Sequence, residues 1–323
     1  MTRARRPAPV GGGRAIDATA DALGGLVARD VPLGPLTTYR VGGPAALFCE
    51  LTSEVHLRRL AEVTTRTGVE VLVVGKGSNL LVSDAGFPGL AIVLGEVFAS
   101  VQVGGVGPSP SIVRAGGAAA LPVVARRTAA AGLTGFEWAV GVPGSVGGAV
   151  RMNAGGHGSD MAATLVRVRV VDLGSGEDCV VPASGLDLAY RRSAVRAFQV
   201  VLWAELGLDP GDRAEAEAQI ADIVRWRRMN QPGGQNAGSV FTNPPDGSAG
   251  ALVEAAGCKA MRVGSACVST KHANFIQVDE AGSADDVFAL MAGVRRRVAE
   301  RTGVVLEPET RLVGFDPLAE PHS

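Results

Sequence analysis

Two glycine-dense stretches constrain this chain more than any other feature of its sequence. The longer one, residues 141–158, reads Gly-Val-Pro-Gly-Ser-Val-Gly-Gly-Ala-Val-Arg-Met-Asn-Ala-Gly-Gly-His-Gly; the shorter occupies residues 73–82, where one apolar run ends and another begins. Glycine lets the backbone approach a ligand closely and leaves its N–H groups free to meet phosphate oxygens. Two such loops at strand ends predict a bulky anionic cofactor, such as a dinucleotide, held from two sides.

Neither common nucleotide-binding fingerprint fits these loops. A Rossmann motif needs GxGxxG between a strand and a helix, with an acidic residue about 20 positions later. In residues 73–82, the first glycine loop along the chain, Leu80 stands where the third glycine should be, and a strand-like segment follows. Residues 141–158 form the second glycine loop. A Walker A loop also fails, because no Gly-Lys-Ser or Gly-Lys-Thr opens a helix. The sequence therefore predicts a cofactor-binding fold of another kind.

Composition narrows the class of protein. A length of 323 residues suffices for two domains with their own cores, and a formal net charge of −1 argues against nucleic acid or an acidic membrane surface as a partner. The four cysteines lack CxxC spacing, which favours reduced cytosolic thiols and argues against a zinc or other metal site. We find no apolar run of the roughly 18 residues that a membrane span requires.

Hydrophobic periodicity predicts an α+β protein. Residues 1–30 are expected to form a flexible tail, disordered to Arg14, and a short helix near Ile16 to Val27. A first domain is expected over residues 31–210 and a smaller α/β domain over 211–323, with turn residues at Gly207 to Asp212 marking the boundary. The expected helices are 55–67, 121–131, 214–229 and 284–302. The expected strands are 69–74, 90–94, 111–114, 166–172, 200–206 and 275–278.

An ordered set of motifs resembles the UDP-N-acetylenolpyruvoylglucosamine reductase family, whose members are also called UDP-N-acetylmuramate dehydrogenases. The resemblance covers about residues 30 to 315, and the order and spacing of the motifs make it specific. The motifs are Thr37-Thr38-Tyr39-Arg40-Val41-Gly42-Gly43-Pro44-Ala45, Gly75 to Val82, Gly141 to Ala149, Asn153-Ala154-Gly155, Tyr190-Arg191-Arg192-Ser193, Gly238-Ser239-Val240-Phe241-Thr242-Asn243-Pro244, Lys271-His272-Ala273-Asn274-Phe275-Ile276 and Leu306-Glu307-Pro308-Glu309.

The resemblance implies a flavin domain of the vanillyl-alcohol oxidase and p-cresol methylhydroxylase type, followed by a substrate-capping domain. In this family FAD is bound noncovalently and NADPH reduces it. The reduced flavin then passes hydride to UDP-N-acetylenolpyruvoylglucosamine, giving UDP-N-acetylmuramate for peptidoglycan precursors. The expected partners are therefore small molecules, and the expected location is the cytoplasm.

Three positions match the family's catalytic residues. Ser239 matches the proton donor, which protonates the carbon next to the substrate carboxylate after hydride addition. Arg191 matches a guanidinium that stabilises the enolic intermediate. Glu309 matches a carboxyl group that manages protons there, a role that requires a raised pKa. Glu307 is the natural decoy, because it lies two residues away and shares a face with Glu309 in an extended segment.

Cofactor and substrate positions follow from the same resemblance. The expected substrate-binding residues are Tyr190, Arg227, Asn243 and Lys271. The expected cofactor-binding residues are Tyr39, Gly75, Lys76, Gly77, Ser78, Asn79, Leu80, Gly116, Gly141, Pro143, Gly144, Ser145, Gly147, Asn153 and Gly155. One departure concerns Asn230, which stands where many members carry a lysine for the substrate diphosphate; Arg227 or Arg228 is the alternative cation. A second is a missing tyrosine-bearing insertion after Arg192, so the chain resembles the short form of the enzyme.

Alternatives remain open at this point. Another FAD-dependent oxidoreductase on the same fold would explain the glycine loops but not the motifs around Ser239 and Glu309. A noncatalytic paralogue would keep the glycines and lose the catalytic side chains, which are all present. His157 could carry a covalent flavin link, as in other oxidases of this fold, but the similar reductases do not use one. His272 is a weaker general-acid candidate than Ser239.

Overall fold

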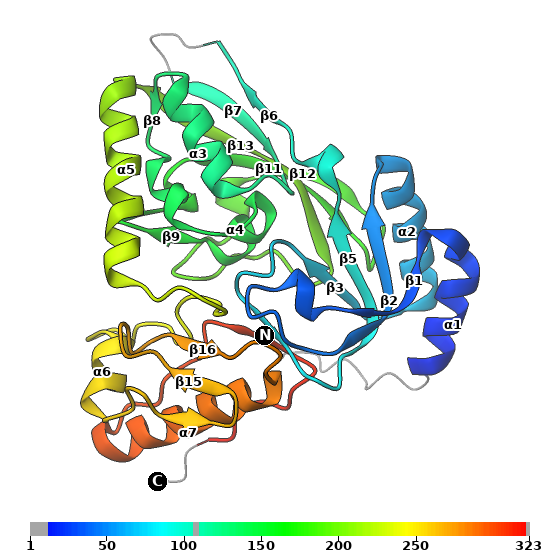
Figure 1. Cartoon of the computed structure of the whole chain (residues 1–323). Coiled ribbons are helices and arrows are strands. Elements are labelled where there is room, and N and C mark those ends of the chain that lie inside the picture. The colour runs from blue at the N-terminus through cyan, green and yellow to red at the C-terminus, as the bar shows by residue number, and fades with distance from the viewer. Residues whose placement is uncertain (1–11, 106–109, 321–323) are drawn as a thin grey trace.

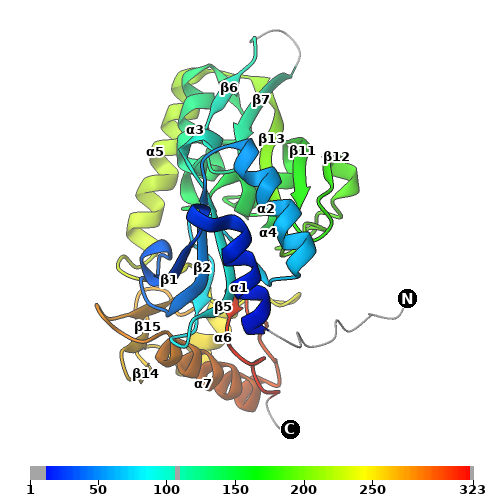
Figure 2. The same cartoon turned by 90° about the vertical axis from the view of Figure 1, so that its right-hand side faces the viewer.

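The first sheet is mixed and carries two helices on one face. The computed structural model describes residues 12–105 and 110–320. The strand order is β1-β2-β5-β3, with β1 antiparallel to β2, while β2 and β3 both run parallel to β5. Helices α1 and α2 pack side by side against this sheet (Figures 1 and 2). The bounds are α1 Gly12–Leu23, β1 Ala28–Pro32, β2 Pro44–Leu51, α2 Glu54–Thr67, β3 Val71–Val74 and β5 Phe87–Leu94.

The second sheet is antiparallel and forms the upper part of the molecule in Figure 1. Its strand order is β12-β11-β13-β7-β6, and β8 pairs with the far end of β13. Three helices, α3, α4 and α5, bury apolar residues in the core on one side of it. The bounds are β6 Val101–Val103, β7 Ser111–Gly116, α3 Leu121–Ala130, β8 Leu133–Thr134, α4 Val146–Met152, β9 Gly155–Gly156, β10 Ser159–Asp160, β11 Leu165–Asp172, β12 Asp178–Pro182, β13 Gln199–Pro210 and α5 Arg213–Asn230.

The C-terminal body has its own core. It contains a three-stranded antiparallel sheet, β14-β15-β16, packed against α7, and it lies below the two larger sheets in Figure 1. Ser283 begins α7 by accepting a hydrogen bond from the N–H of Asp286, and Gly303 ends it at φ 72°. Tyr39, Val41 and Leu81 from the N-terminal half join this core. The bounds are α6 Ala249–Ala255, β14 Arg262–Val263, β15 Ala266–Val268, β16 Ile276–Val278 and α7 Ala284–Thr302.

One strand pair joins the end of the chain to the first glycine loop. Strand β17 (Arg311–Val313) runs parallel to β4 (Leu80–Val82), pairing Arg311 with Leu80. A second link is Asp84, whose carboxylate accepts hydrogen bonds from the Ser283 hydroxyl at 2.6 Å and from the Ala284 N–H at 3.1 Å. The C-terminal body is therefore tied to the larger body, which contains the first two sheets, immediately beside the first glycine loop.

The α+β expectation and most of the expected elements are confirmed. The expected helix 284–302 matches α7 at both ends, and the helix 55–67 differs from α2 by one residue. The expected strands correspond to β3, β5, β7, β11, β13 and β16.

Two expectations were wrong, one about where the N-terminal tail ends and one about the turn after residue 206. Gly12 to Arg14 are not tail, because α1 begins at Gly12 and buries Leu23 against the first sheet; residues 1–11 of the expected tail lie outside the described residues. The turn expected at Gly207 to Asp212 does not begin at Gly207, because strand β13 continues through Pro210. Asp209 and Pro210 pair with β8 at the end of this strand, and these turn-forming residues were mistaken for a loop.

Helix α5 does not pack where a boundary near residue 210 would place it. Its buried residues Ala216, Ile220 and Ile223 belong to the core of the second sheet, whereas the C-terminal core begins at Ala237. We therefore propose that the division between the bodies falls after Asn230.

Candidate active site

A cavity of about 570 Å³ lies where the two bodies meet. The larger body lines it with both glycine loops, and the C-terminal body lines it with Gly238, Ser239 and Phe275. The pairing of β17 with β4 adds Glu309 and Arg311 to the same wall. A cleft of several hundred Å³ between two bodies is a common place for an organic ligand.

The first glycine loop faces this cavity along its whole length. The loop starts where β3 ends, and Gly77 has φ 60° while its carbonyl accepts a hydrogen bond from the Thr38 N–H at 3.2 Å. A Cβ atom on Gly75 would lie 2.6 Å from the Ser145 hydroxyl, so a side chain there would close the space between the two loops. All six expected residues of this loop line the cavity: Gly75, Lys76, Gly77, Ser78, Asn79 and Leu80.

The second loop approaches from the opposite side. Gly141, Pro143, Gly144 and Ser145 line the large cavity, and Ser145 begins α4 by accepting a hydrogen bond from the Gly148 N–H at 3.4 Å.

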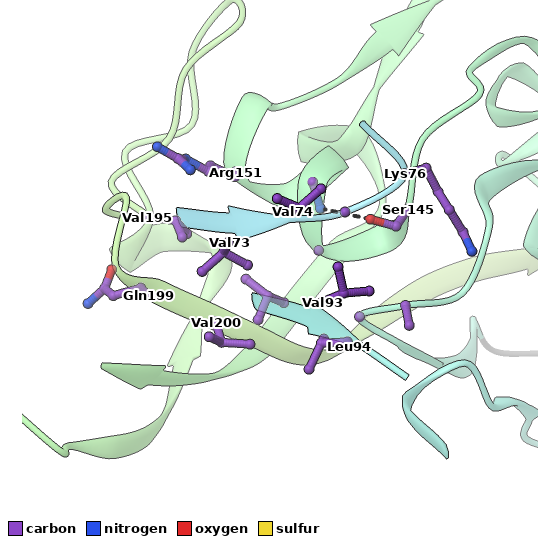
Figure 3. A pocket seen from close by; sticks show the side chains of 16 residues that line it. Val73, Val74, Lys76, Val93, Leu94, Ser145, Arg151, Val195, Gln199 and Val200 are labelled. Atoms are coloured by element: carbon purple, nitrogen blue, oxygen red, sulfur yellow. Dashed lines mark hydrogen bonds between the residues drawn. The ribbon is translucent and has the colours of Figure 1, made fainter. Parts of the chain in front are cut away.

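Gly147 lines an adjoining apolar slot of about 80 Å³ instead. Figure 3 shows the slot between β3, β5 and β13, with Val73, Val93 and Val200 around it and Ser145 at one side. The small slot and the large cavity therefore adjoin at the two loops, and Gly75, Lys76 and Ser145 line both.

The three expected catalytic residues meet at the large cavity. Arg191 has φ 55° in a tight turn closed by a bridge between Ala189 and Arg192. Its Nε donates to Oε1 of Glu309 at 2.7 Å, and an Nη atom donates to the carbonyl of Gly155 at 3.1 Å. Ser239 and both of these side chains belong to the cavity lining, although the three come from distant parts of the chain.

The backbone of Glu309 is fixed from two sides. Its N–H donates to the carbonyl of Val240 at 2.8 Å, and its carbonyl accepts a hydrogen bond from the side chain of Asn79 at 3.0 Å. Burial raises the pKa of the Glu309 carboxyl group, and Arg191 partly offsets the rise. The direction agrees with the expectation of a carboxyl group that holds a proton more readily than usual.

Glu307 does not reach this site. Its side chain is 72% exposed, lies 4.0 Å from the Arg295 guanidinium and does not belong to the cavity lining.

Several expected cofactor positions lie behind the loops. Asn153 is buried, ends α4 at φ 40°, and bonds through its side chain to Asp160, Ala189 and the Ala162 N–H. Tyr39 is fully buried in the C-terminal core, and this burial raises its pKa. Gly116 packs directly under the backbone of Phe98. Gly155, in contrast, lines the cavity and positions Arg191.

Of the expected substrate residues, only Arg227 lines the cavity. Tyr190 is 56% exposed and packs its ring against the Arg191 guanidinium, 4.9 Å from Cζ to the ring centroid. Lys271 donates through Nζ to the carbonyl of Arg228 at 2.5 Å. Asn243 accepts a hydrogen bond from the Ala249 N–H at the start of α6. These three side chains do not line the cavity, and each contacts other groups of the protein instead.

Arg151, Trp226 and Arg311 are among the lining residues that received no role from the sequence. Arg151 lies in the last turn of α4 and lines both cavities; burial lowers its pKa to about 10, with Arg311 contributing. Trp226 lines the large cavity from the last turn of α5. Position offered a signal for two of them, since Arg151 lies inside the long glycine stretch and Arg311 follows Glu309 by two residues. For Trp226 the sequence offers only its place beside Arg227.

Within residues 12–105 and 110–320, no group of three or more histidine, cysteine, aspartate or glutamate side chains is arranged to hold a metal ion. The same residues include no helix with the length and apolar character needed to cross a membrane.

Comparisons with known proteins identify the family. Residues 229–313 match the family "UDP-N-acetylenolpyruvoylglucosamine reductase, C-terminal domain", and residues 45–180 match "FAD binding domain". The chain is 40% identical to the UDP-N-acetylenolpyruvoylglucosamine reductase of Synechococcus sp. (strain WH7803), over 90% of this chain and 94% of that one. It is 41% identical to the reductase of Rubrobacter xylanophilus, over 88% and 94%. The chain belongs to the UDP-N-acetylenolpyruvoylglucosamine reductase family.

The fold agrees with that membership. The crystal structure of the Thermus caldophilus reductase of this family superposes with a TM-score of 0.77 at 35% identity, covering 89% of this chain and 98% of that one. The FAD binding domain match spans the first glycine loop and most of the second sheet.

The residues at the cavity fit FAD. The two loops approach each other closely enough at Gly75 and Ser145 that a single Cβ would fill the gap, as expected where backbone must contact a diphosphate. The large cavity of about 570 Å³ next to these loops has room for an organic cofactor. The loops therefore have the space and the chemistry that this cofactor requires.

Proposed function

We propose that this chain reduces UDP-N-acetylenolpyruvoylglucosamine to UDP-N-acetylmuramate in peptidoglycan precursor synthesis, with FAD as its cofactor and NADPH as the hydride source. We place the reaction in the cytoplasm. The observation that carries the proposal is the meeting of Ser239, Arg191 and Glu309 at one cavity between two glycine loops. The reductase name of relatives similar over nine-tenths of the chain supports it.

The glycine loops are proposed to hold FAD noncovalently. Backbone N–H groups of residues 75–80 and of Gly144 and Ser145 would face its diphosphate, and Lys76 would add a positive charge. When bound, FAD carries hydride from NADPH to the methylene carbon of the substrate's enol ether. Gly147 would line the slot, while Tyr39, Gly116 and Asn153 would hold the loops from behind. Acid precipitation should release the flavin, whereas colour retained in the pellet would contradict noncovalent binding and implicate His157.

Ser239 is proposed to complete the reduction. Addition of hydride to the methylene carbon leaves negative charge on the neighbouring carbon and its carboxylate, and a proton must be delivered to that carbon. A serine hydroxyl is a weak acid, but an enolate is a strong base. The Ser239 Oγ therefore transfers its proton to this carbon in the second half of the reaction.

Arg191 and Glu309 are proposed to manage the charge of the same intermediate. The guanidinium stabilises negative charge where it develops on the carboxylate oxygens. The raised pKa of Glu309 makes its carboxyl group able to hold and supply a proton at this position. Arg227 would meet the substrate diphosphate in place of a lysine at Asn230, supported by Tyr190, Lys271 and Asn243 in the walls.

Separate half-reactions test this function. In the FAD-loaded Ser239→Ala variant, anaerobic reduction of the flavin by NADPH should survive, while reoxidation by UDP-N-acetylenolpyruvoylglucosamine should slow by about 10²-fold to 10⁴-fold or more. Equal damage to both halves would instead indicate a role in folding or flavin binding. If the reduced wild type is reoxidised by oxygen but not by this substrate, another oxidoreductase on the same fold is the better assignment.

A further inference from the structure

Trp226 lines the cavity without taking part in the reduction described above. It is 44% exposed, an unusual state for so large an apolar side chain within a cavity wall. Its ring packs against that of His157, with centroids 5.1 Å apart and planes at 88°. An aromatic ring that is held by a neighbour yet open to a cavity is suited to stack on a planar ligand.

The path of the chain connects Trp226 to the reacting end of the site. From Trp226 the chain returns to the cavity wall at Arg227, Gln231 and Asn236 before it reaches Ser239. A ligand whose reacting carbon lies at Ser239 can therefore extend along one continuous segment towards Trp226.

Arg227 places a cation next to this ring. Its Nε donates to Oε1 of Gln231 at 2.7 Å, and no carboxylate of the described residues pairs with it. Burial lowers the pKa of Arg227, as expected for a cation partly removed from water without a counter-charge. An unpaired guanidinium beside an open aromatic ring matches the two recognisable parts of a nucleotide, its phosphates and its base.

His157 fixes the indole from behind. Its backbone has φ 52°, and its ring lies so close to Gly141 that a Cβ there would be 3.3 Å away. Burial, with Arg227 adding to it, lowers the pKa of His157 and so favours the neutral ring. A neutral ring held between a glycine and an indole acts on orientation, without adding charge.

We propose that Trp226 stacks on the base of a nucleoside diphosphate whose phosphates contact Arg227, with His157 as a positioning residue for the indole. The inference rests on the proposed function, which supplies two ligands of this chemistry: the uridine diphosphate of the sugar nucleotide and NADPH. What they share is a planar heteroaromatic ring that carries a diphosphate, and the experiment separates the two sources.

The test measures binding of UDP, NADP⁺ and inorganic diphosphate by calorimetry to the FAD-loaded protein. Trp226→Ala should weaken binding of UDP or of NADP⁺ by roughly tenfold to a hundredfold, whichever base stacks there, and should leave binding of diphosphate unchanged. Trp226→Phe should recover much of the loss. Met229→Ala is the matched control, because this 63% exposed residue lies on the same helix outside the cavity lining.

A double mutant tests the part assigned to His157. If His157 acts only by orienting the indole, His157→Ala weakens nucleotide binding in the wild type but has no further effect in the Trp226→Ala background. Additive losses would overturn the positioning role.

Other outcomes bear on the subsite as a whole. Unchanged affinity of the Trp226→Ala variant for both nucleotides would overturn the subsite alone. Loss of FAD from this variant, to the same degree as the loss of nucleotide binding, would also overturn it, because Trp226 would then belong to the cofactor site. A wild type that binds neither nucleotide would overturn the proposed function together with the subsite.

Discussion

Two glutamates with side chains only 6% (Glu205) and 15% (Glu309) exposed pair with arginine, and they differ in how they respond to that pairing. Glu205, on β13 in the second sheet, bonds to both Arg114 and Arg167, whose guanidinium groups are about half exposed. These bonds lower the pKa of the Glu205 carboxyl group despite its burial. Glu309 has one partner, Arg191, and its pKa is raised because burial outweighs that single bond.

The difference lies in the surroundings of each pair, since the residue types are the same. Glu205 is covered mainly by its own arginines at the surface of a sheet, so two cations near water hold it ionised. Glu309 lies between the two bodies, and Arg191 shares its donors with the carbonyl of Gly155. One pair is therefore suited to structural stability and the other to the movement of a proton.

The largest expected effect concerns catalysis. Arg191→Lys and Glu309→Gln should each slow substrate reduction by about 10²-fold to 10³-fold with flavin binding intact, because lysine cannot reproduce the guanidinium fork and glutamine cannot exchange a proton. Glu205→Gln should leave this rate nearly unchanged. Single-turnover reoxidation of the reduced enzyme by substrate measures the three rates.

The double variant sharpens that result. If Arg191 and Glu309 act on one intermediate, the combined loss should be smaller than the sum of the single losses in free energy. Strict additivity would show that they act on separate steps.

The next effect concerns stability against pH. The pKa of Glu309 is higher in the folded protein than unfolded, so the native state binds more protons and its stability falls as pH rises through the raised pKa. Glu309→Gln should remove this decline. Glu205 has the opposite sign: its contribution is present above its ordinary pKa and is lost as pH falls through the lowered folded value.

Thermal unfolding from about pH 2 to about pH 9 distinguishes the two glutamates. Glu205→Gln should lower the melting temperature by a few degrees at pH 7, with the deficit shrinking in acid, because its arginines lose their acceptor. If the loss of stability of Glu205→Gln relative to wild type were largest in acid, this assignment would be contradicted.

The smallest expected effect is that of Glu307→Gln. Its side chain is mostly exposed and faces Arg295, so both substrate reduction and the unfolding free energy should stay within experimental error of wild type. A catalytic loss as large as that of Glu309→Gln, measured in the same reoxidation experiment, would show that the wrong carboxylate has been assigned.

Much of the site could be predicted because it consists of local motifs. The residues of both glycine loops, with Ser239, Arg191 and Glu309, lie where short runs such as Gly-Ser-Val-Phe-Thr-Asn-Pro placed them. Helix α7 was predictable to the residue, because a serine cap and a stop glycine flank a periodic apolar face. In each case the information lies within about ten neighbouring residues.

Which polar side chains of these motifs line the cavity was less predictable. Asn153, Asn243 and Lys271 belong to motifs of the family, yet their side chains bond to nearby backbone groups outside the cavity lining. A polar residue in a functional motif can bind a ligand or hold the loop that does, and local sequence does not distinguish these.

The sequence by itself determined most of the helices and strands, the two glycine loops and the motifs that carry the proposed reacting side chains, because these depend on neighbours along the chain. Only the tertiary structure decided what the cavity wall contains. Parallel pairing of β17 with β4 brings Glu309 and Arg311 beside Asn79, and the packing of α5 on the second sheet sets Trp226 against His157. Such contacts join residues far apart in sequence, and they form because burying apolar surface between elements outweighs any local preference.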